Sequence, residues 1–345
     1  LNNPGDELPF STLRQPPYGL DRYEAFQEIA RELRKCQPPV VDAFLYRDIQ
    51  AFLTETGQLS LNGFSDGWSS LLGYQNHFAV GAGPHSLWSQ APLLLVTKPN
   101  TDILEQSAIN EITNYVQNGG TLLMRADAGR TVIDSSDDWV LLQAFGLVPP
   151  TTEPAWNLVK TAVPNAGSIF STGAGSFALR DIITSPAQSN IALEAVYDGN
   201  TATPAMISKT YGSGKVIVIW AHTIIPPQFN TANYRFLRDV VSWAGGTLTT
   251  DCTSDRFWLN ALTTSDPDLN YGLVNYGQGI SGLATAQTSA VTRWLFLPDG
   301  TYNVHELISN TIVGQFTGQS LRETGITTTL NPREVVIYRF SRIAL

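Results

Sequence analysis

The segment from Ala91 to Arg130 constrains the fold more than any other part of the chain. It begins with an apolar run at 93–96, which has the length and composition of a strand buried on both faces. Apolar residues then recur at helical spacing after Thr101, which is placed as an N-cap. Asn118-Gly119-Gly120 should end this helix, because glycine accepts the left-handed conformation of a C-terminal cap, and a second apolar run follows at 121–124. Strand, helix and strand in this order predict a βαβ unit within a parallel sheet.

Further periodic segments extend this region over residues 39–248. The predicted elements are strands at 40–46 and 77–80, a helix at 137–145, a hairpin at 205–220 and a helix at 230–244. Residues 149–205 are rich in Pro, Gly, Ser and Thr, so we expect loops and small antiparallel strands there. The predicted fold class is α/β, with a flavodoxin-like parallel sheet and flanking helices.

The two ends of the chain differ from this central region. Residues 1–38 read as an extended arm followed by an amphipathic linker helix, whose apolar face must lie on a neighbouring domain or a partner. Residues 249–345 change to a period of two and predict a small all-β sandwich. Its expected strands are Phe257–Asn260, Leu269–Tyr276, Val291–Leu297, Gly300–Leu307 and Val335–Phe340.

Charge and composition exclude several classes of partner. The formal net charge is −9, and no run of lysine or arginine is present, so we expect no nucleic-acid partner. No apolar stretch has the length of a membrane helix, so no membrane association is expected. Few lysines and many Thr, Ser, Asn and Gln residues are typical of secreted proteins, which suggests an extracellular or periplasmic location. The chain begins at Leu1 without methionine, so we expect a processed, trimmed or partial chain.

The motifs of common cofactor sites are missing from the sequence. There is no Gly-x-Ser-x-Gly elbow, phosphate loop or dinucleotide fingerprint, and no cofactor is expected. The four histidines do not have the spacing of metal ligands, so no metal site is predicted either: His77, His85, His222 and His305.

Two cysteines, Cys36 and Cys252, lie just outside the two ends of the α/β region. They can be two unrelated thiols. Because the ends of a domain often lie near each other, they can also form a disulfide that joins those ends.

Several motifs resemble a known family. Tyr115-Val116-Gln117-Asn118-Gly119-Gly120-Thr121, Tyr211-Gly212-Ser213-Gly214-Lys215 and Trp243-Ala244-Gly245-Gly246 together resemble the glutamine-amidotransferase-like trimerisation domain of microbial beta-galactosidases of glycoside hydrolase family 42. In that family a catalytic (β/α) barrel precedes this domain and a β-sandwich follows it. Gly300-Thr301-Tyr302 and Pro332-Arg333-Glu334 look like that terminal sandwich.

The resemblance implies a non-catalytic role. The barrel, with its two catalytic glutamates, would lie before Leu1. The chain would then act as a scaffold that oligomerises, as a trimer by resemblance, or that supports a separate catalytic barrel chain.

Class I glutamine amidotransferases carry a cysteine nucleophile on a tight strand-to-helix turn. The matching turn here is Arg125-Ala126-Asp127-Ala128-Gly129, and an aspartate cannot perform thiolate chemistry. His222 follows the strand that ends at Trp220, near the position of the family's histidine, but no glutamate accompanies it. We therefore expect no amidotransferase activity.

Asp127 and His222 remain candidates for another site. Both should follow the carboxyl ends of sheet strands, where open α/β folds bind ligands. They can form a hydrolytic pair, joined by Asp134, Asp137 or Asp138, or a relic pocket whose polar groups satisfy each other.

The eight tryptophans suggest one more function, because indole faces stack on sugar rings. Trp220, Trp243, Trp258 and Trp294 lie in apolar runs and are predicted core residues. The candidates for carbohydrate contact lie in or near loops, where they can equally be packing residues: Trp68, Trp88, Trp139 and Trp156. An extracellular carbohydrate-binding or structural protein is thus the alternative to the scaffold.

Overall fold

The computed structural model describes residues 27, 29–37, 39–40, 43–47, 78–82, 91–96, 103–132, 138–170, 175–224, 231–254, 257–276, 287–332 and 334–343. The chain divides into two compact units. One is formed by residues 40–248, and the other by residues up to 39 together with residues from 249 onward.

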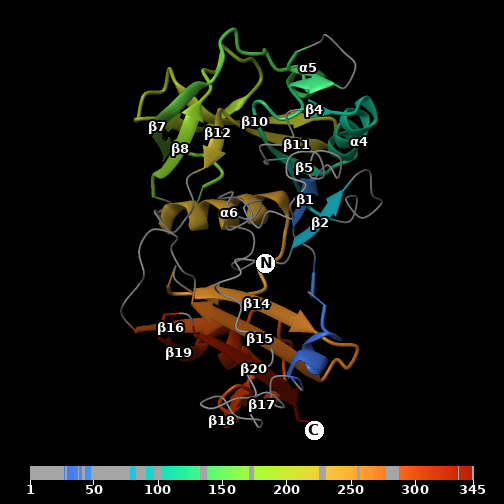
Figure 1. Cartoon of the computed structure of the whole chain (residues 1–345), viewed down its shortest axis with the longest axis vertical. Helices are drawn as coiled ribbons and strands as arrows, with labels where there is room; N and C mark the ends of the chain where they lie inside the picture. The colour runs from blue at the N-terminus through green and yellow to red at the C-terminus, as the bar shows by residue number, and fades with distance from the viewer. Residues whose placement is uncertain are drawn as a thin grey trace, which may run out of the picture. The chain divides into compact units, whose positions relative to one another are not determined.

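The unit of residues 40–248 is built on one ten-stranded sheet, and half of that sheet is parallel (Figure 1). Its parallel strands lie in the order β11-β5-β3-β1-β2. Their bounds are Gly214–Ile219 for β11, Thr121–Arg125 for β5, Leu93–Val96 for β3, Ala43–Arg47 for β1 and Phe78–Ala82 for β2. The side chains of β3 and β5 are all buried, as expected for strands covered on both faces.

The other half of the sheet is antiparallel and continues from β11 in the order β10-β9-β7-β8-β12. The bounds are Pro204–Tyr211 for β10, Ala192–Tyr197 for β9, Ala155–Pro164 for β7, Phe177–Ile182 for β8 and Ala221–Ile224 for β12. Trp220 alone separates β11 from β12 in the sequence, although four strands separate them in the sheet. The antiparallel strands must therefore curl back toward β11, and this half of the sheet forms a half-barrel.

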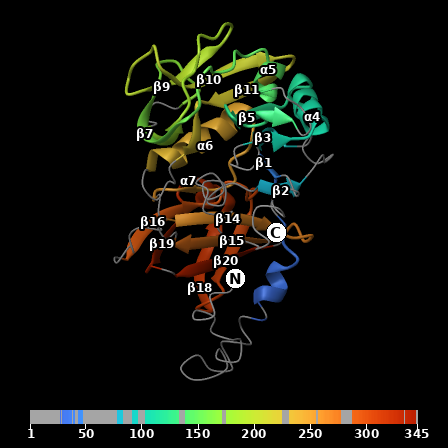
Figure 2. The same ribbon diagram turned by 45° about the horizontal axis from the view of Figure 1, so that its top comes forward.

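Among the described residues of this unit, three helices accompany the sheet: α4 (Gln106–Gln117), α5 (Val140–Ala144) and α6 (Thr231–Ala244). Helix α4 packs on β5 and β11 (Figure 2), and α6 packs on β8. The buried stripe of α4 joins the alternate residues of β5 and β11 in one core: Ala108, Ile109, Ile112, Val116, Leu122, Met124, Val216 and Val218.

The predicted βαβ unit is confirmed, with one correction at the start of its helix. Residues Ile103–Leu104 form strand β4, which pairs in parallel with β6 (Thr131–Val132). Helix α4 therefore begins after Glu105, and Thr101 is not its N-cap. Its end is as predicted, because Gly119 has a φ of 113°.

The predicted fold class is confirmed only in part. The sheet has a parallel half, but a flavodoxin-like parallel sheet with flanking helices is not what the described residues show, since they are mostly strands with few helices. The difference arises in residues 149–205, where we expected loops and small antiparallel strands. Antiparallel strands β7, β8 and β9 do lie there, but they extend the main sheet, which was not predicted.

The turn between β10 and β11 packs tightly on the end of α4. A Cβ atom on Gly214 would lie 2.0 Å from the carbonyl oxygen of Val116 and 2.3 Å from that of Gly120. Both neighbours are backbone, so neither can move aside without disturbing the helix end.

We expect Gly214→Ala to lower the free energy of unfolding by about 1–3 kcal/mol, because the added methyl group overpacks this contact. Urea unfolding followed by circular dichroism measures the change. Ser213→Ala, an exposed neighbour in the same turn, is the control. Equal stability of the two variants would contradict the packing argument.

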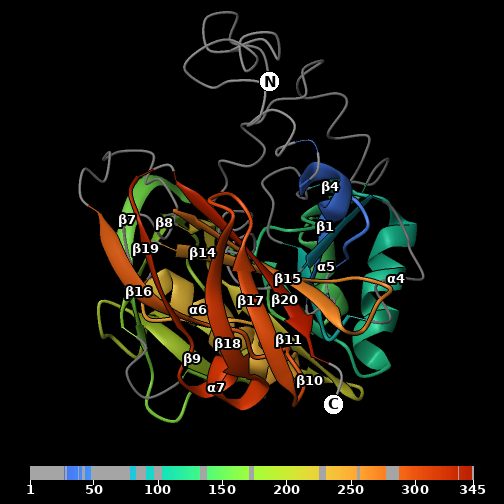
Figure 3. The ribbon, with the colours of Figure 1, turned by 90° about the horizontal axis from the view of Figure 1, so that it is seen from below.

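The second unit contains two sheets that share one core. The larger has the order β14-β15-β20-β17-β18, and Figure 3 shows several of its strands side by side; the smaller has the order β13-β16-β19. The bounds are Asp251–Cys252 for β13, Phe257–Thr263 for β14, Leu269–Tyr276 for β15, Thr288–Arg293 for β16, Thr301–Glu306 for β17, Thr311–Thr317 for β18, Ile326–Leu330 for β19 and Val335–Arg342 for β20. Helix α7 (Gly318–Glu323) lies between β18 and β19 in the sequence. All five predicted strands have a counterpart here, whereas β13, β18, β19 and α7 were not predicted.

The helix before residue 38 belongs to this second unit. Its described helical residues are 27 and 29–33, and the backbone of Gln37 exchanges hydrogen bonds with that of Thr263 at 3.0 and 2.8 Å. The Tyr271 hydroxyl donates to the Glu32 carboxylate at 2.7 Å. These polar contacts tie the helix to the sandwich, and Ile29, Ala30 and Leu33 of its predicted apolar face are half-buried.

Of the two alternatives for Cys36 and Cys252, the structure has the two thiols and not the disulfide. The Cys36 thiol donates to the carbonyl oxygen of Glu32 at 3.6 Å, within its own helix. Cys252 lies on β13, where its sulfur accepts from the backbone N–H of Ser254 at 3.4 Å. Burial, followed by the charge of Glu32, raises the pKa of the Cys36 thiol.

In the described part of the chain, no helix combines the length and the apolar character needed to cross a membrane.

Candidate functional site

Asp127 and His222 meet where two neighbouring parallel strands end. Asp127 follows β5 and His222 lies at the start of β12, just past the end of β11. The Nδ1 atom of His222 lies 2.5 Å from Oδ2 of Asp127. The structure therefore brings together the two residues that strand-end reasoning selected.

Arg125 is the third member of this cluster and is fully buried. Its Nη1 atom donates to the carbonyl oxygen of His222 at 3.1 Å and lies 3.2 Å from the Nδ1 atom of the same residue. Its Nε atom lies 3.4 Å from Oδ1 of Asp127, as an ion pair. The guanidinium thus neutralises a carboxylate that is only 4% exposed.

These contacts decide the ionisation of Asp127. Burial alone would raise the pKa of the carboxyl, but the charge of Arg125 and the hydrogen bond from His222 outweigh it, so the pKa lies below its ordinary value. Because Oδ2 of Asp127 lies 2.5 Å from Nδ1 of His222, we assign a proton to Nδ1, which donates it to the carboxylate. Nη1 of Arg125 then donates to the main-chain oxygen of His222 and not to Nδ1. In the neutral ring, Nε2 is then the acceptor.

The lowered pKa makes stability depend on pH. A depressed folded-state pKa contributes stability above the unfolded-state value, here 3.8, and that contribution is lost as the pH falls through the folded-state pKa. We therefore expect the stability difference between the wild type and Asp127→Asn to be largest near neutral pH and to shrink below pH 3.8. Urea unfolding of both proteins across this range measures it, and a difference that stays constant would contradict the ion pair.

Trp156 lies beside this cluster and is 58% exposed. Its ring meets that of His222 edge to face, with centroids 5.3 Å apart. Of the sugar-contact candidates, it is the one placed next to Asp127 and His222.

A bulge in β7 holds Trp156 in this place. Ala155 pairs with Ile182 and Val159 with Arg180, so residues 156–158 oppose Asp181 alone. Asn157 has a φ of 63°, and its N–H donates to Oδ1 of Asp181 at 2.6 Å. The buried Asp181 carboxylate therefore fixes the backbone next to the tryptophan.

The other predicted candidates lie elsewhere or outside the described residues. Trp139 is 6% exposed, and Arg130 covers its ring at 4.7 Å, so its faces are not open to a sugar. Asp138 does not join the pair, because it accepts hydrogen bonds from Arg130. Trp68, Trp88, Asp134 and Asp137 lie outside the described residues, as do His77 and His85.

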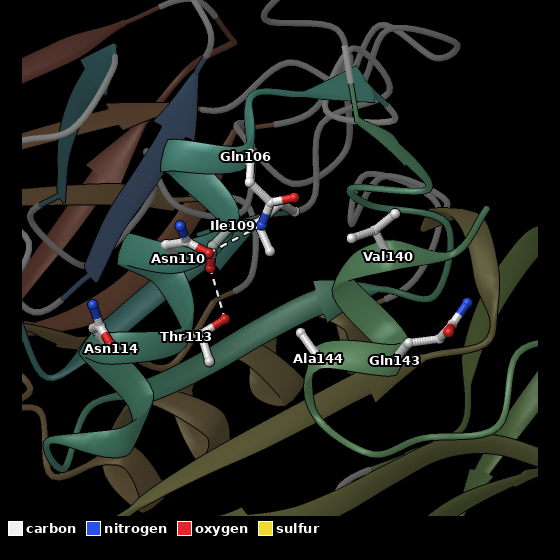
Figure 4. Close-up of a pocket in the computed structure, with 8 residues that line it drawn as sticks. All are labelled: Gln106, Ile109, Asn110, Thr113, Asn114, Val140, Gln143 and Ala144. Carbon is white, nitrogen blue, oxygen red and sulfur yellow. Dashed lines mark hydrogen bonds between the residues drawn. The ribbon is translucent and has the colours of Figure 1, made fainter. Parts of the chain in front are cut away.

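A separate groove of about 510 Å³ lies between α4 and α5. Most of its lining consists of amide and hydroxyl side chains (Figure 4): Gln106, Asn110, Thr113, Asn114 and Gln143. Gln106 donates to Asn110 at 3.0 Å, and Thr113 donates to the backbone of Ile109 at 2.6 Å. None of the residues selected from the sequence lines this groove.

Sequence reasoning missed Arg125 and Asp181. Arg125 had a usable signal, because it is a charged residue at the end of the fully apolar run 122–124. A cation in that position needs a buried anion, and Asp127 is two residues away. Asp181 had no such signal, since its role depends on the register between β7 and β8.

Within the described ranges, no three His, Cys, Asp or Glu side chains are grouped so that they could hold a metal ion.

Comparisons with solved structures give the fold. A family 42 glycoside hydrolase beta-galactosidase from G. stearothermophilus, solved as a catalytic mutant, matches 92% of this chain at 16% identity with a TM-score of 0.59, over 44% of its own length. The beta-galactosidase from Rahnella sp. R3 matches 93% of this chain at 11% identity with a TM-score of 0.63, over 43% of its own length. An alpha-L-fucosidase isoenzyme from Paenibacillus thiaminolyticus matches 93% at 14% identity with a TM-score of 0.54, over 51% of its own length.

The chain thus has the fold of part of a glycoside hydrolase, and it spans about half or less of the length of these enzymes. No protein-family model matches it. No curated protein matches it either.

Proposed function

We propose that this chain is the non-catalytic C-terminal region of a beta-galactosidase-like glycoside hydrolase and supports a catalytic barrel outside the given sequence. The observation that carries the proposal is the ion-paired state of Asp127. The residue at the nucleophile's turn is 4% exposed and is engaged by both Arg125 and His222. A carboxylate that is buried and paired in this way is not exposed to attack a substrate, and its removal would leave the buried guanidinium uncompensated.

The structural likenesses support the same proposal. Two beta-galactosidases match more than 90% of this chain but less than half of their own length. The remaining half of such an enzyme has room for a barrel. The glutamine-amidotransferase-like motifs and the sandwich motifs favour the C-terminal part of the enzyme as the matching part.

The assembly we propose is a homo-oligomer, a trimer by resemblance. Light scattering of the purified protein should then give the mass of three chains of 37.6 kDa. A monomer at micromolar concentration would contradict the oligomerisation role.

Activity measurements test the non-catalytic role. We expect the purified chain to release no nitrophenol from aryl-β-galactosides above the buffer rate. A family 42 beta-galactosidase in the same assay is the positive control. Turnover that survives repeated purification and follows the protein peak would disprove the proposal.

A second candidate function is hydrolysis by the Asp127–His222 pair, and the 2.5 Å contact between them favours it. The carboxylate orients the imidazole, whose Nε2 atom can accept a proton from water or from a substrate hydroxyl. A panel of nitrophenyl esters and glycosides tests this function. Activity that falls by about a hundredfold or more in His222→Gln would support it, and activity unchanged in that variant would exclude the pair.

A further inference from the structure

We propose that Trp156 and His222 form a binding subsite for a neutral pyranose, as found in an oligosaccharide. This inference is independent of the scaffold role, because it concerns a site within residues 40–248 and needs neither a barrel nor an oligomer.

The first argument is the combination of an open indole with a fixed acceptor. Trp156 exposes 58% of its surface, and its edge-to-face contact with His222 sets the orientation of both rings. Nδ1 of His222 is engaged by Asp127, and Nε2 has no hydrogen-bond partner in the described part of the chain. A ligand here meets an apolar face beside a hydrogen-bond acceptor.

A pyranose has the matching surfaces. The C–H groups on one side of the ring form an apolar face that can lie on the indole, and the hydroxyls at its rim can donate to Nε2. Few other small neutral molecules place a rigid apolar face and several hydroxyl donors so close together.

The charges of the site favour a neutral ligand. Arg125 and Asp127 form an ion pair with no net charge. The guanidinium is fully buried and donates to the main-chain carbonyl oxygen of His222. Among Arg125, Asp127 and His222 an anionic sugar would find no exposed guanidinium, and the exposed Arg180 beside the bulge is already paired with Asp181 at 3.3 Å. The chain also carries a formal net charge of −9, which disfavours the approach of anions.

The site is held in place before a ligand binds. Asp181 anchors the Trp156 bulge through the Asn157 N–H, and Asp127 with Arg125 holds His222. In the sheet, β8 lies between β7, which carries Trp156, and β12, which carries His222. A site made of ordered strands loses little conformational freedom on binding.

Calorimetric titration of the full chain with lactose and cellobiose tests the proposal, with a galacturonic acid dimer as the anionic probe. We expect one or both neutral disaccharides to bind and the anionic dimer to bind more weakly. Trp156→Ala should weaken binding at least about tenfold, because it removes the stacking face. Trp156→Phe, which keeps an aromatic face, should restore part of the affinity.

Leu158→Ala is the matched control, since Leu158 is also exposed on the same bulge and should not contact the sugar. His222→Gln adds a second test, because it removes the positioned acceptor while leaving Trp156 in place. Absence of binding by both neutral sugars, or equal binding by the wild type and Trp156→Ala, would overturn the subsite. A change of oligomeric mass in Trp156→Ala without sugar binding would also overturn it and would assign this surface to a protein contact.

Discussion

Replacing Asp127 with alanine is expected to lower the free energy of unfolding by about 3–5 kcal/mol. The substitution leaves the Arg125 guanidinium, which is fully buried, without the carboxylate that neutralises it. It also removes the acceptor for Nδ1 of His222. The buried guanidinium and the half-buried imidazole therefore lose a partner together, and urea unfolding followed by circular dichroism measures the loss of stability.

The control separates a buried ion pair from an exposed one. Asp138 pairs with Arg130 at 2.8 Å, but its side chain is 49% exposed, so Asp138→Ala should cost no more than about 1 kcal/mol. The double variant Arg125→Met/Asp127→Leu removes both charges and should recover most of the loss, because no uncompensated ion remains. Equal losses in the single variants Asp127→Ala and Asp138→Ala would contradict the role given to the buried pair.

Trp294→Ala is expected to destabilise the sandwich unit by about 3–5 kcal/mol. The indole is fully buried and packs on the rings of Tyr338 and Phe340, at centroid distances of 6.1 and 5.4 Å. Gly272 leaves room for it, because a Cβ atom there would lie 2.5 Å from the indole. Nε1 of Trp294 makes no hydrogen bond within the described residues, so the loss comes from packing and from the cavity left behind.

The same chemical change at an exposed site provides the control. Trp156→Ala removes an indole that is 58% exposed and should change the unfolding free energy by less than about 0.5 kcal/mol. Urea unfolding measures both variants. Similar losses at Trp156 and Trp294 would show that burial does not decide the cost.

The parallel half of the main sheet was predictable because each of its central strands can be recognised from its own residues alone. Leu93–Val96 and Thr121–Arg125 are buried on both faces, so the sequence has to be an apolar run there. The antiparallel half gave no such signal. Most residues of β7 are exposed. Trp156 and Val159 are apolar but exposed, so their apolar character does not indicate a buried strand. Its membership of the sheet depends on pairing with distant strands, which a local pattern cannot reveal.

The candidate site, like the sheet, was predictable only in part. Asp127 and His222 could be selected because each follows a strand that the sequence shows clearly, and neighbouring parallel strands end at one edge of a sheet. The proximity of Trp156 could not be predicted in this way, since it depends on the bulge opposite Asp181 and on the curling of β7 and β8 toward β12. The N-cap assigned to Thr101 failed for a related reason: the pairing of β4 with β6 took precedence over local capping.

Four of the five strands of the half-barrel, β7 to β10, lie in one long segment of the chain that leaves the parallel strands after β5 and returns to them at β11. Asp127 lies at the start of this segment and His222 lies just after its end, 95 positions later. Their contact therefore joins the two ends of the segment without a covalent bond, as a non-covalent clasp. Lengthening the turns inside such a closed loop costs little, because closure entropy grows only with the logarithm of loop length. The intervening strands can therefore gain or lose residues at their tips during evolution, provided that the clasp itself is kept.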